Sequence, residues 1–196
     1  MKQLNSFLLS FIVFFAFSCS KNNGEISNQQ QSNALTQSTS STSTTESSSP
    51  YIVTLESVTQ TGNASWTWIW SVRNSNPGNG NNGTVQDLSH WGFTLGECIT
   101  AENIISAAYS FNGTDWVTFT PTIGVDPSQT CMQSAVLKFD AGTVGHQKTY
   151  YSLTVNQNYV SEPLTGGYYK SGNRTGCGLL SYMGIGCGTP TVGEER

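Results

Sequence analysis

Apolar and polar residues alternate along much of the chain between Tyr51 and Pro190. The stretch WTWIWSV, residues 66–72, is the clearest case, because three of the chain's five tryptophans occupy every second position in it. Successive side chains of a β-strand point to opposite faces of its sheet. The three tryptophans and Val72 should therefore share one face of a strand, and the mostly polar residues between them should share the other.

This tryptophan face has two interpretations, a hydrophobic core and an exposed platform on which sugars stack. A platform would leave the opposite face of the strand to supply the core, and Thr67, Ile69 and Ser71 are poorly suited to that. Each tryptophan can bury roughly 200 Å², and a chain with 36% hydrophobic residues needs that area. We therefore expect the strip in the core, with Trp66, the outermost, partly exposed and a candidate ligand contact.

The other alternating segments are also short, and glycine-rich connections separate them. Asn112-Gly113 indicates a hairpin, because Asn-Gly accepts positive φ. One short turn of helix is expected within residues 101–108. The expected strands are 51–55, 66–72, 91–95, 108–111, 116–119, 136–139 and 150–155. This pattern predicts an all-β fold, a single β-sandwich of about seven to nine antiparallel strands in residues 51–190, with a tail at 191–196.

Residues 1–18 have the features of an export signal. A basic start at Lys2 precedes the apolar run 7–17, which is shorter than the roughly 20 residues of a membrane-spanning helix and typical of a secretory signal. The run leads into Ala16-Phe17-Ser18-Cys19, which resembles the lipobox of bacterial lipoproteins. The resemblance implies cleavage before Cys19 and acylation of that residue, palmitate included. The alternative is an ordinary secretion signal followed by an incidental cysteine.

Residues 19–50 are expected to form a disordered tether behind the lipidated Cys19. From Ser20 to Pro50, 23 of 31 residues are Ser, Thr, Asn or Gln, and such a segment has too little apolar surface to offset the entropy of ordering its backbone. As a flexible coil it would span about 30 Å, enough to hold a domain clear of lipid headgroups. In the bacterial lipoproteins that this segment resembles, an Asp after the lipidated Cys marks retention at the inner membrane. Ser20 occupies that position here, so the resemblance implies the outer membrane.

Four cysteines follow the tether: Cys98, Cys131, Cys177 and Cys187. An even number in an exported domain predicts disulfides, with three pairings open. We favour Cys98–Cys131 with Cys177–Cys187, the second of which would close a small glycine-rich loop. Zinc is the competing interpretation, but no CxxC or CxH spacing supports it. We expect no metal site and no cofactor.

The polar residues give few signs of chemistry. In Asp87-Leu88-Ser89-His90-Trp91 a Ser, a His and an Asp lie close in sequence, but catalytic triads converge from separate segments and the GxSxG elbow is absent. His90 is expected to cap a loop or to hydrogen-bond a backbone carbonyl at a strand start. Asp87 and His90 remain candidate ligand-binding residues, and no catalytic residue is assigned.

The carboxylates and one asparagine-rich loop bear on two further chemistries, glycoside cleavage and calcium binding. No spacing singles out a catalytic pair of carboxylates among Asp87, Glu97, Asp115, Asp126 and Asp140. The loop NSNPGNGNNG, residues 74–83, offers oxygen ligands but no carboxylate, so we expect a plain mobile loop rather than a calcium site. The net charge of −4, with no basic stripe, argues against a nucleic-acid partner.

The motifs WxWxV, LSHW, LKFD (Leu137 to Asp140) and YYKSGNRTGCG together resemble a group of uncharacterised extracellular bacterial modules. The resemblance implies a β-rich secreted module with structural disulfides, and it brings no known active site. We therefore expect a cell-envelope lipoprotein, anchored in the outer membrane by lipid, that displays a noncatalytic sandwich for binding or adhesion to a glycan or protein through loops such as 74–86 and 156–167. The alternatives are a hydrolase of surface polysaccharide and a structural envelope component without a soluble ligand.

Overall fold

A computed structural model gives the structure, which describes residues 49–189. The predicted signal peptide, the lipidation site Cys19, nearly all of the tether and the tail 191–196 lie outside these residues. Within them, no helix is long and apolar enough to cross a membrane.

Residues 49–189 form ten strands and one short 3-10 helix. In chain order these elements are β1 (Tyr51–Gly62), β2 (Ser65–Asn74), β3 (Leu88–Phe93), the 3-10 helix η1 (Ala101–Asn103), β4 (Ile104–Ser110), β5 (Val117–Phe119), β6 (Thr122–Gly124), β7 (Val136–Phe139), β8 (Lys148–Val155), β9 (Val160–Ser171) and β10 (Cys177–Gly186). The all-β prediction is confirmed, with one strand more than the expected range. Residues 156–167, expected as a loop, instead contain the first eight of the twelve residues of β9.

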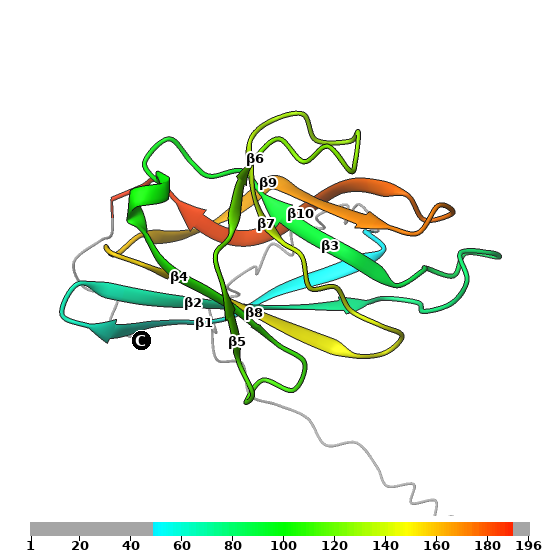
Figure 1. Ribbon diagram of the computed structural model, residues 1–196, viewed down its shortest axis with the longest axis horizontal. Coiled ribbons are helices and arrows are strands. Elements are labelled where there is room, and N and C mark those ends of the chain that lie inside the picture. Colours follow the sequence, from blue (N-terminus) through cyan, green and yellow to red (C-terminus); the bar gives the residue numbers. More distant parts are fainter. Residues whose placement is uncertain (1–48, 190–196) are drawn as a thin grey trace, which may run out of the picture. The chain divides into compact units, whose positions relative to one another are not determined.

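The strands form two antiparallel sheets of five (Figure 1). One has the order β1-β2-β8-β4-β5 and is called here the β8 sheet after its central strand. The other has the order β10-β9-β3-β7-β6 and is called the β3 sheet. The arrangement is the predicted sandwich.

The chain crosses from one sheet to the other between two edge strands. β5 is the edge of the β8 sheet and β6 the edge of the β3 sheet, and Thr120 and Pro121 alone separate them. Figure 1 shows β5 and β6 following each other from the lower layer to the upper. Pro121 has no backbone N–H, so its place outside both ladders leaves no donor unpaired.

The tryptophan strip of β2 lies in the core, as predicted. Trp68 and Trp70 are fully buried, and Trp66 at the end of the strip is half-buried. Across the sandwich, the Trp70 ring lies 5.6 Å from that of Phe93 and 6.5 Å from that of Trp91, centroid to centroid. Aromatic rings from both sheets therefore supply the burial that the aliphatic residues of this chain are too few to provide.

Candidate functional site

His90 lies on the outer face of the β3 sheet. Its neighbours Trp91 and Phe93 belong to the core, and a register shift between Leu88 and His90 leaves Ser89 as an extra residue in the strand. His90 is nevertheless only 6% exposed. The reason is the connection between β6 and β7, residues 125–135, which brings Asp126 against it and is called here the β6–β7 segment.

Asp126 is the centre of a buried polar cluster. Its Oδ2 lies 2.8 Å from Nε2 of His90 and accepts a hydrogen bond from the Tyr168 hydroxyl at 3.0 Å. Its Oδ1 accepts hydrogen bonds from the backbone N–H and the hydroxyl of Ser128, at 3.0 and 2.7 Å, and lies 3.5 Å from Nζ of Lys138. These five residues are called here the Asp126 cluster. Because the Asp126 side chain is 2% exposed, these contacts stand in for the water that a carboxylate would otherwise bind.

The three β-strands of the cluster meet at Gly92. Lys138 of β7 and Tyr168 of β9 are its ladder partners on either side. A Cβ at Gly92 would clash with the backbone carbonyl oxygen of Leu137 and would lie 2.8 Å from Cε1 of the Tyr168 ring, so both the β7 backbone and the ring need a glycine at this position. The absence of a side chain at residue 92 thus lets the tyrosine hydroxyl reach Asp126.

Burial and hydrogen bonding set the charges in the cluster. Burial raises the pKa of Asp126, but the hydrogen bonds from Ser128, Tyr168 and His90 outweigh it and hold the pKa well below its usual range. Burial lowers the pKa of His90, and the charge of Lys138 lowers it further against the opposing effect of Asp126. At neutral pH the cluster therefore contains an ionised carboxylate and a neutral imidazole that donates Nε2–H to it.

The Asp126 cluster contains Ser, His and Asp, but they are not arranged for nucleophilic catalysis. In a triad, Nε2 of the histidine faces the serine, Nδ1 faces the carboxylate, and the groups converge from separate segments. Here the ring is reversed, because Asp126 Oδ2 and Ser128 Oγ lie 2.8 and 3.3 Å from Nε2. The serine beside Nδ1, at 3.3 Å, is Ser89, the residue next to His90 in the chain. The contacts hold the β6–β7 segment against the sheet, and we assign the cluster a structural role.

The three candidate ligand-binding residues do not form one site. Trp66 belongs to the β8 sheet, His90 is buried under the β6–β7 segment, and no hydrogen bond or ion pair joins any two of the three. Asp87 Oδ1 accepts a hydrogen bond from the backbone N–H of Gly145 at 2.7 Å, so this carboxylate fastens a turn. The carboxylate that pairs with His90 is Asp126, which lies 36 residues away in sequence. His90 therefore bonds neither Asp87 nor the expected backbone carbonyl.

The expected disulfide pairing is wrong. Cys98 bonds to Cys187, and the two thiols of Cys131 and Cys177 are free. The reason lies in the course of β10, whose last residue, Gly186, has its carbonyl 4.0 Å from the Cys98 sulfur. The bond joins the end of β10 to the segment before the 3-10 helix.

The loop 74–86 is tied to itself and to its neighbours. The side-chain amide of Asn74 donates to the carbonyls of Val85 and Gln86, both at 3.0 Å, and Pro77 forms a bridge with Val85. The side-chain amide of Asn74 thus hydrogen-bonds backbone carbonyls of the loop itself. Nowhere in residues 49–189 do three His, Cys, Asp or Glu side chains come together as a metal site would require.

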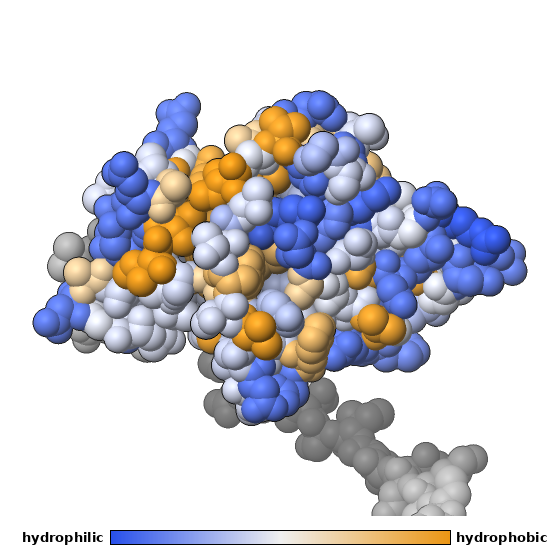
Figure 2. Space-filling model, in the orientation of Figure 1, coloured by the Kyte–Doolittle hydropathy of each residue, from blue (hydrophilic) through white to orange (hydrophobic). Residues whose placement is uncertain are grey.

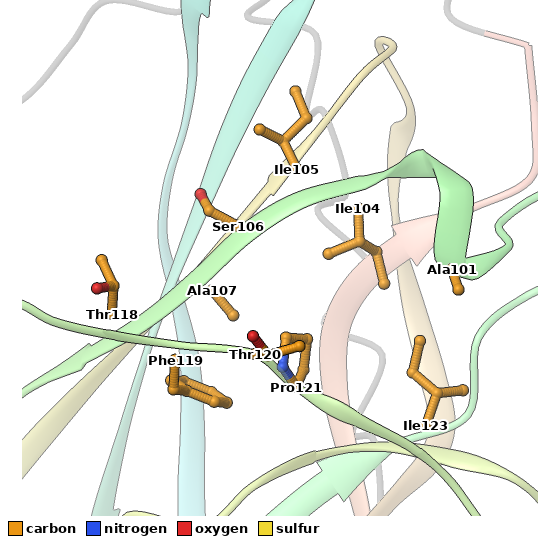
Figure 3. A pocket seen from close by; sticks show the side chains of 10 residues that line it. All are labelled: Ala101, Ile104, Ile105, Ser106, Ala107, Thr118, Phe119, Thr120, Pro121 and Ile123. Carbon is orange, nitrogen blue, oxygen red and sulfur yellow. The ribbon is translucent and has the colours of Figure 1, made fainter.

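A groove of about 450 Å³ opens beside the β5–β6 crossing. Its apolar lining comes mainly from Ile104, Phe119, Pro121 and Ile123, and Figure 3 shows Ile104 and Ile123 on opposite sides of the space, with Ile105 pointing away from it. Figure 2 shows hydrophobic residues gathered over this part of the surface, between the 3-10 helix and β6. The groove is therefore an exposed apolar depression at the open side of the sandwich.

The chemistry of the groove is limited to contact and hydrogen bonding. Its polar side chains are the hydroxyls of Ser106, Thr118 and Thr120, and none of its lining residues is an Asp, Glu, His, Cys, Lys or Arg. A second hollow of about 350 Å³ shares Phe119 and Thr120 with it and contains one carboxylate, Asp140. Paired carboxylates, which glycoside cleavage uses, do not line either depression.

Sequence reasoning missed Asp126 as the partner of His90 and missed the groove. One local signal for Asp126 existed, because Asp-Pro-Ser is typical of a turn in which the Asp side chain accepts from the backbone two residues on, and Ser128 N–H does donate to Asp126. Nothing in the spacing of residues 90, 126 and 168 indicates that they meet.

Comparison with known proteins adds little to this geometry. No family model matches the sequence, and no curated protein matches it either. Two solved structures of the GH20 exo-β-N-acetylglucosaminidase from Vibrio harveyi, one with N-acetylglucosamine and one of an inactive mutant, are similar with TM-scores of 0.38 and 0.36 and identities of 11% and 12%. The match covers 68% of this chain and 18% of each of theirs. At these values the function has to be inferred from the geometry of this chain alone.

Proposed function

We propose that this chain is a lipid-anchored protein of the bacterial cell envelope whose β-sandwich binds a glycan or protein ligand without catalysing a reaction. The observation that carries the proposal is the separation of the groove from the ionisable groups. The groove offers apolar surface and three hydroxyls at a volume suited to a ligand. Among the described residues, the buried Asp and His side chains, Asp126 and His90, lie instead in the Asp126 cluster, where their neighbours hydrogen-bond them.

The binding residues proposed are Ile104, Phe119 and Ile123, with Thr118 and Thr120 as hydrogen-bonding groups. Ile123 is 38% exposed, so its side chain can meet a ligand without rearrangement of the fold. The edge strands β5 and β6, which carry most of these residues, are fixed by their short ladders to β4 and β7. A preformed groove of this kind loses little entropy on binding.

The experiment that separates a binder from the rival polysaccharide hydrolase measures retention and turnover together. The full chain would be run in native gels cast with soluble β-glucans, α-glucans, xylan and mannan, screened on an array of extended peptides, and assayed for released reducing sugar. Retention or peptide binding without released sugar is the expected result. Released sugar that tracks protein concentration would establish the hydrolase, and no binding at all would favour a structural envelope component.

The lipid anchor is the second part of the proposal, and it rests on the Ala16-Phe17-Ser18-Cys19 sequence. Several acyl chains on Cys19 would give lasting membrane attachment, whereas a soluble exported domain has none. Cys19→Ser is expected to move the protein from the outer-membrane fraction to the soluble fraction, and metabolic labelling with a palmitate analogue should be lost with it. Unchanged fractionation and no labelling of the unsubstituted protein would contradict the anchor.

A further inference from the structure

Cys131 and Cys177 come together on the outer face of the β3 sheet. The Cys131 sulfur lies 4.0 Å from the carbonyl oxygen of Tyr169 on β9. Cys177 is the first residue of β10 and pairs with Lys170, the next residue of β9. Neighbouring strands are about 4.8 Å apart, so the β6–β7 segment brings Cys131 over the point where Cys177 lies.

The two thiols are close enough to shift each other's pKa. Burial, and to a smaller extent the neighbouring Cys177 thiol, raise the pKa of Cys131 to about 12. Burial also raises the pKa of Cys177, but hydrogen bonds from Cys131 and from the backbone of Thr130 outweigh it, so the net direction is downward. Cys177 is therefore the thiol that ionises first, and both side chains are half-buried rather than sealed from solvent.

We propose that Cys131 and Cys177 form a second disulfide that fastens the β6–β7 segment to β10. In the reaction, the Cys177 thiolate attacks the disulfide of an exchange partner. A mixed disulfide forms between Cys177 and the partner, and one partner thiolate is released. The Cys131 thiol then loses its proton and attacks the Cys177 sulfur, so that the second partner thiol leaves. Two protein thiols are oxidised and one partner disulfide is reduced to two thiols.

The cross-link holds the β6–β7 segment at a second point. Asp126 fastens the start of the segment to β3, β7 and β9, and the disulfide fastens its middle to β10. β6 precedes the segment and is held by its ladder to β7 over Thr122–Gly124, and these two attachments add to that ladder. Since Ile123 of β6 lines the groove, the disulfide also stabilises one wall of the proposed binding site.

Peptide mapping of the purified exported chain tests the cross-link directly and needs no ligand. The protein would be alkylated under denaturing conditions without reductant and digested with chymotrypsin. Trypsin is unsuitable, because it leaves Cys98 with Cys131 on residues 74–138 and Cys177 with Cys187 on residues 175–196. Chymotrypsin can cut between the members of each pair, for example after Tyr109 and Tyr182. The expected products are one peptide linking 131 to 177 and one linking 98 to 187.

Single and double substitutions provide the second readout. Cys131→Ser, Cys177→Ser and the double variant are each expected to lower the thermal midpoint by the same amount, about 10 °C, and to speed hydrogen exchange of the amides of residues 122–135. Equal single and double effects indicate one shared bond. Alkylated Cys131 and Cys177 in the unsubstituted protein, or peptides linking 98 to 131 or 177 to 187, would overturn the proposal whatever the outcome of the ligand experiments.

Discussion

Asp126→Ala is expected to destabilise the domain by about 3–5 kcal/mol, because removing one member of a buried ionic cluster leaves the others without a partner. The alanine would leave the Tyr168 hydroxyl, the His90 Nε2–H and the Ser128 backbone N–H unpaired in a site where the Asp126 side chain is 2% exposed. Urea denaturation followed by tryptophan fluorescence measures the free energy of unfolding.

Asp140→Asn is the matched control for this prediction. Asp140 also pairs with Lys138, at 2.9 Å, but its side chain is 70% exposed, and an ion pair of this kind contributes less than about 1 kcal/mol. If Asp126→Ala cost no more than Asp140→Asn, the Asp126 cluster would not be the attachment of the β6–β7 segment.

The dependence of stability on pH gives a second readout of the Asp126 cluster. The pKa of Asp126 is lowered by folding from its usual value of 3.8, so its contribution is present above that pH and is lost as the pH falls further. The pKa of His90 is lowered from 6.5; its contribution is complete above 6.5 and declines as the pH falls through the folded-state value. Both groups therefore weaken the fold in acid, and Asp126→Ala should flatten the acid limb of the stability curve.

Trp91→Ala is expected to cost about 3–5 kcal/mol, the range for removing a large aromatic side chain from a core. Trp91 is fully buried, and its ring lies within 5.3 Å of those of Phe139 and Tyr151, centroid to centroid, which come from different sheets. The loss would therefore leave a cavity between the two layers. The free energy of unfolding in urea is again the measurement.

Two further variants sharpen the Trp91 prediction. Trp116→Ala removes the same side chain from a half-buried position outside the core, and should cost about 1 kcal/mol. Trp91→Phe should cost much less than Trp91→Ala, because it keeps a ring and removes an indole N–H that has no hydrogen-bond partner among the described residues. Equal costs for Trp91→Ala and Trp116→Ala would contradict the assignment of Trp91 to the centre of the core.

The sequence was most informative where one residue type repeats with the period of a strand. The tryptophan strip of β2 predicted a core face, and the structure buries Trp68 and Trp70 completely. β9 was missed because Pro163, Gly166 and Gly167 interrupt its pattern, and β6 because three residues are too few to show a period. Residues 177–187, expected as a glycine-rich loop, contain β10 instead. The sandwich could thus be predicted from seven of its ten strands.

The candidate site depended on contacts that spacing does not encode. His90 drew notice for its neighbours Asp87 and Ser89, but its partner Asp126 reaches it through the β6–β7 segment. The pairing of Cys98 with Cys187, 89 residues apart, likewise follows from the position of the end of β10. The groove is formed where β5 leaves one sheet and β6 joins the other, and such a crossing has no sequence signature beyond Pro121.

Comparing Ile123→Asp with Val144→Asp in the binding assays tests the central claim most directly. Ile123 lines the groove and is 38% exposed, while Val144 is 63% exposed in a turn that does not line it. Both changes place a carboxylate on a β-branched surface position, so they differ mainly in location. For whichever polysaccharide or peptide the unsubstituted chain binds, Ile123→Asp should weaken binding at least tenfold and Val144→Asp should leave it unchanged. Equal binding by the two variants would contradict a binding site at the groove.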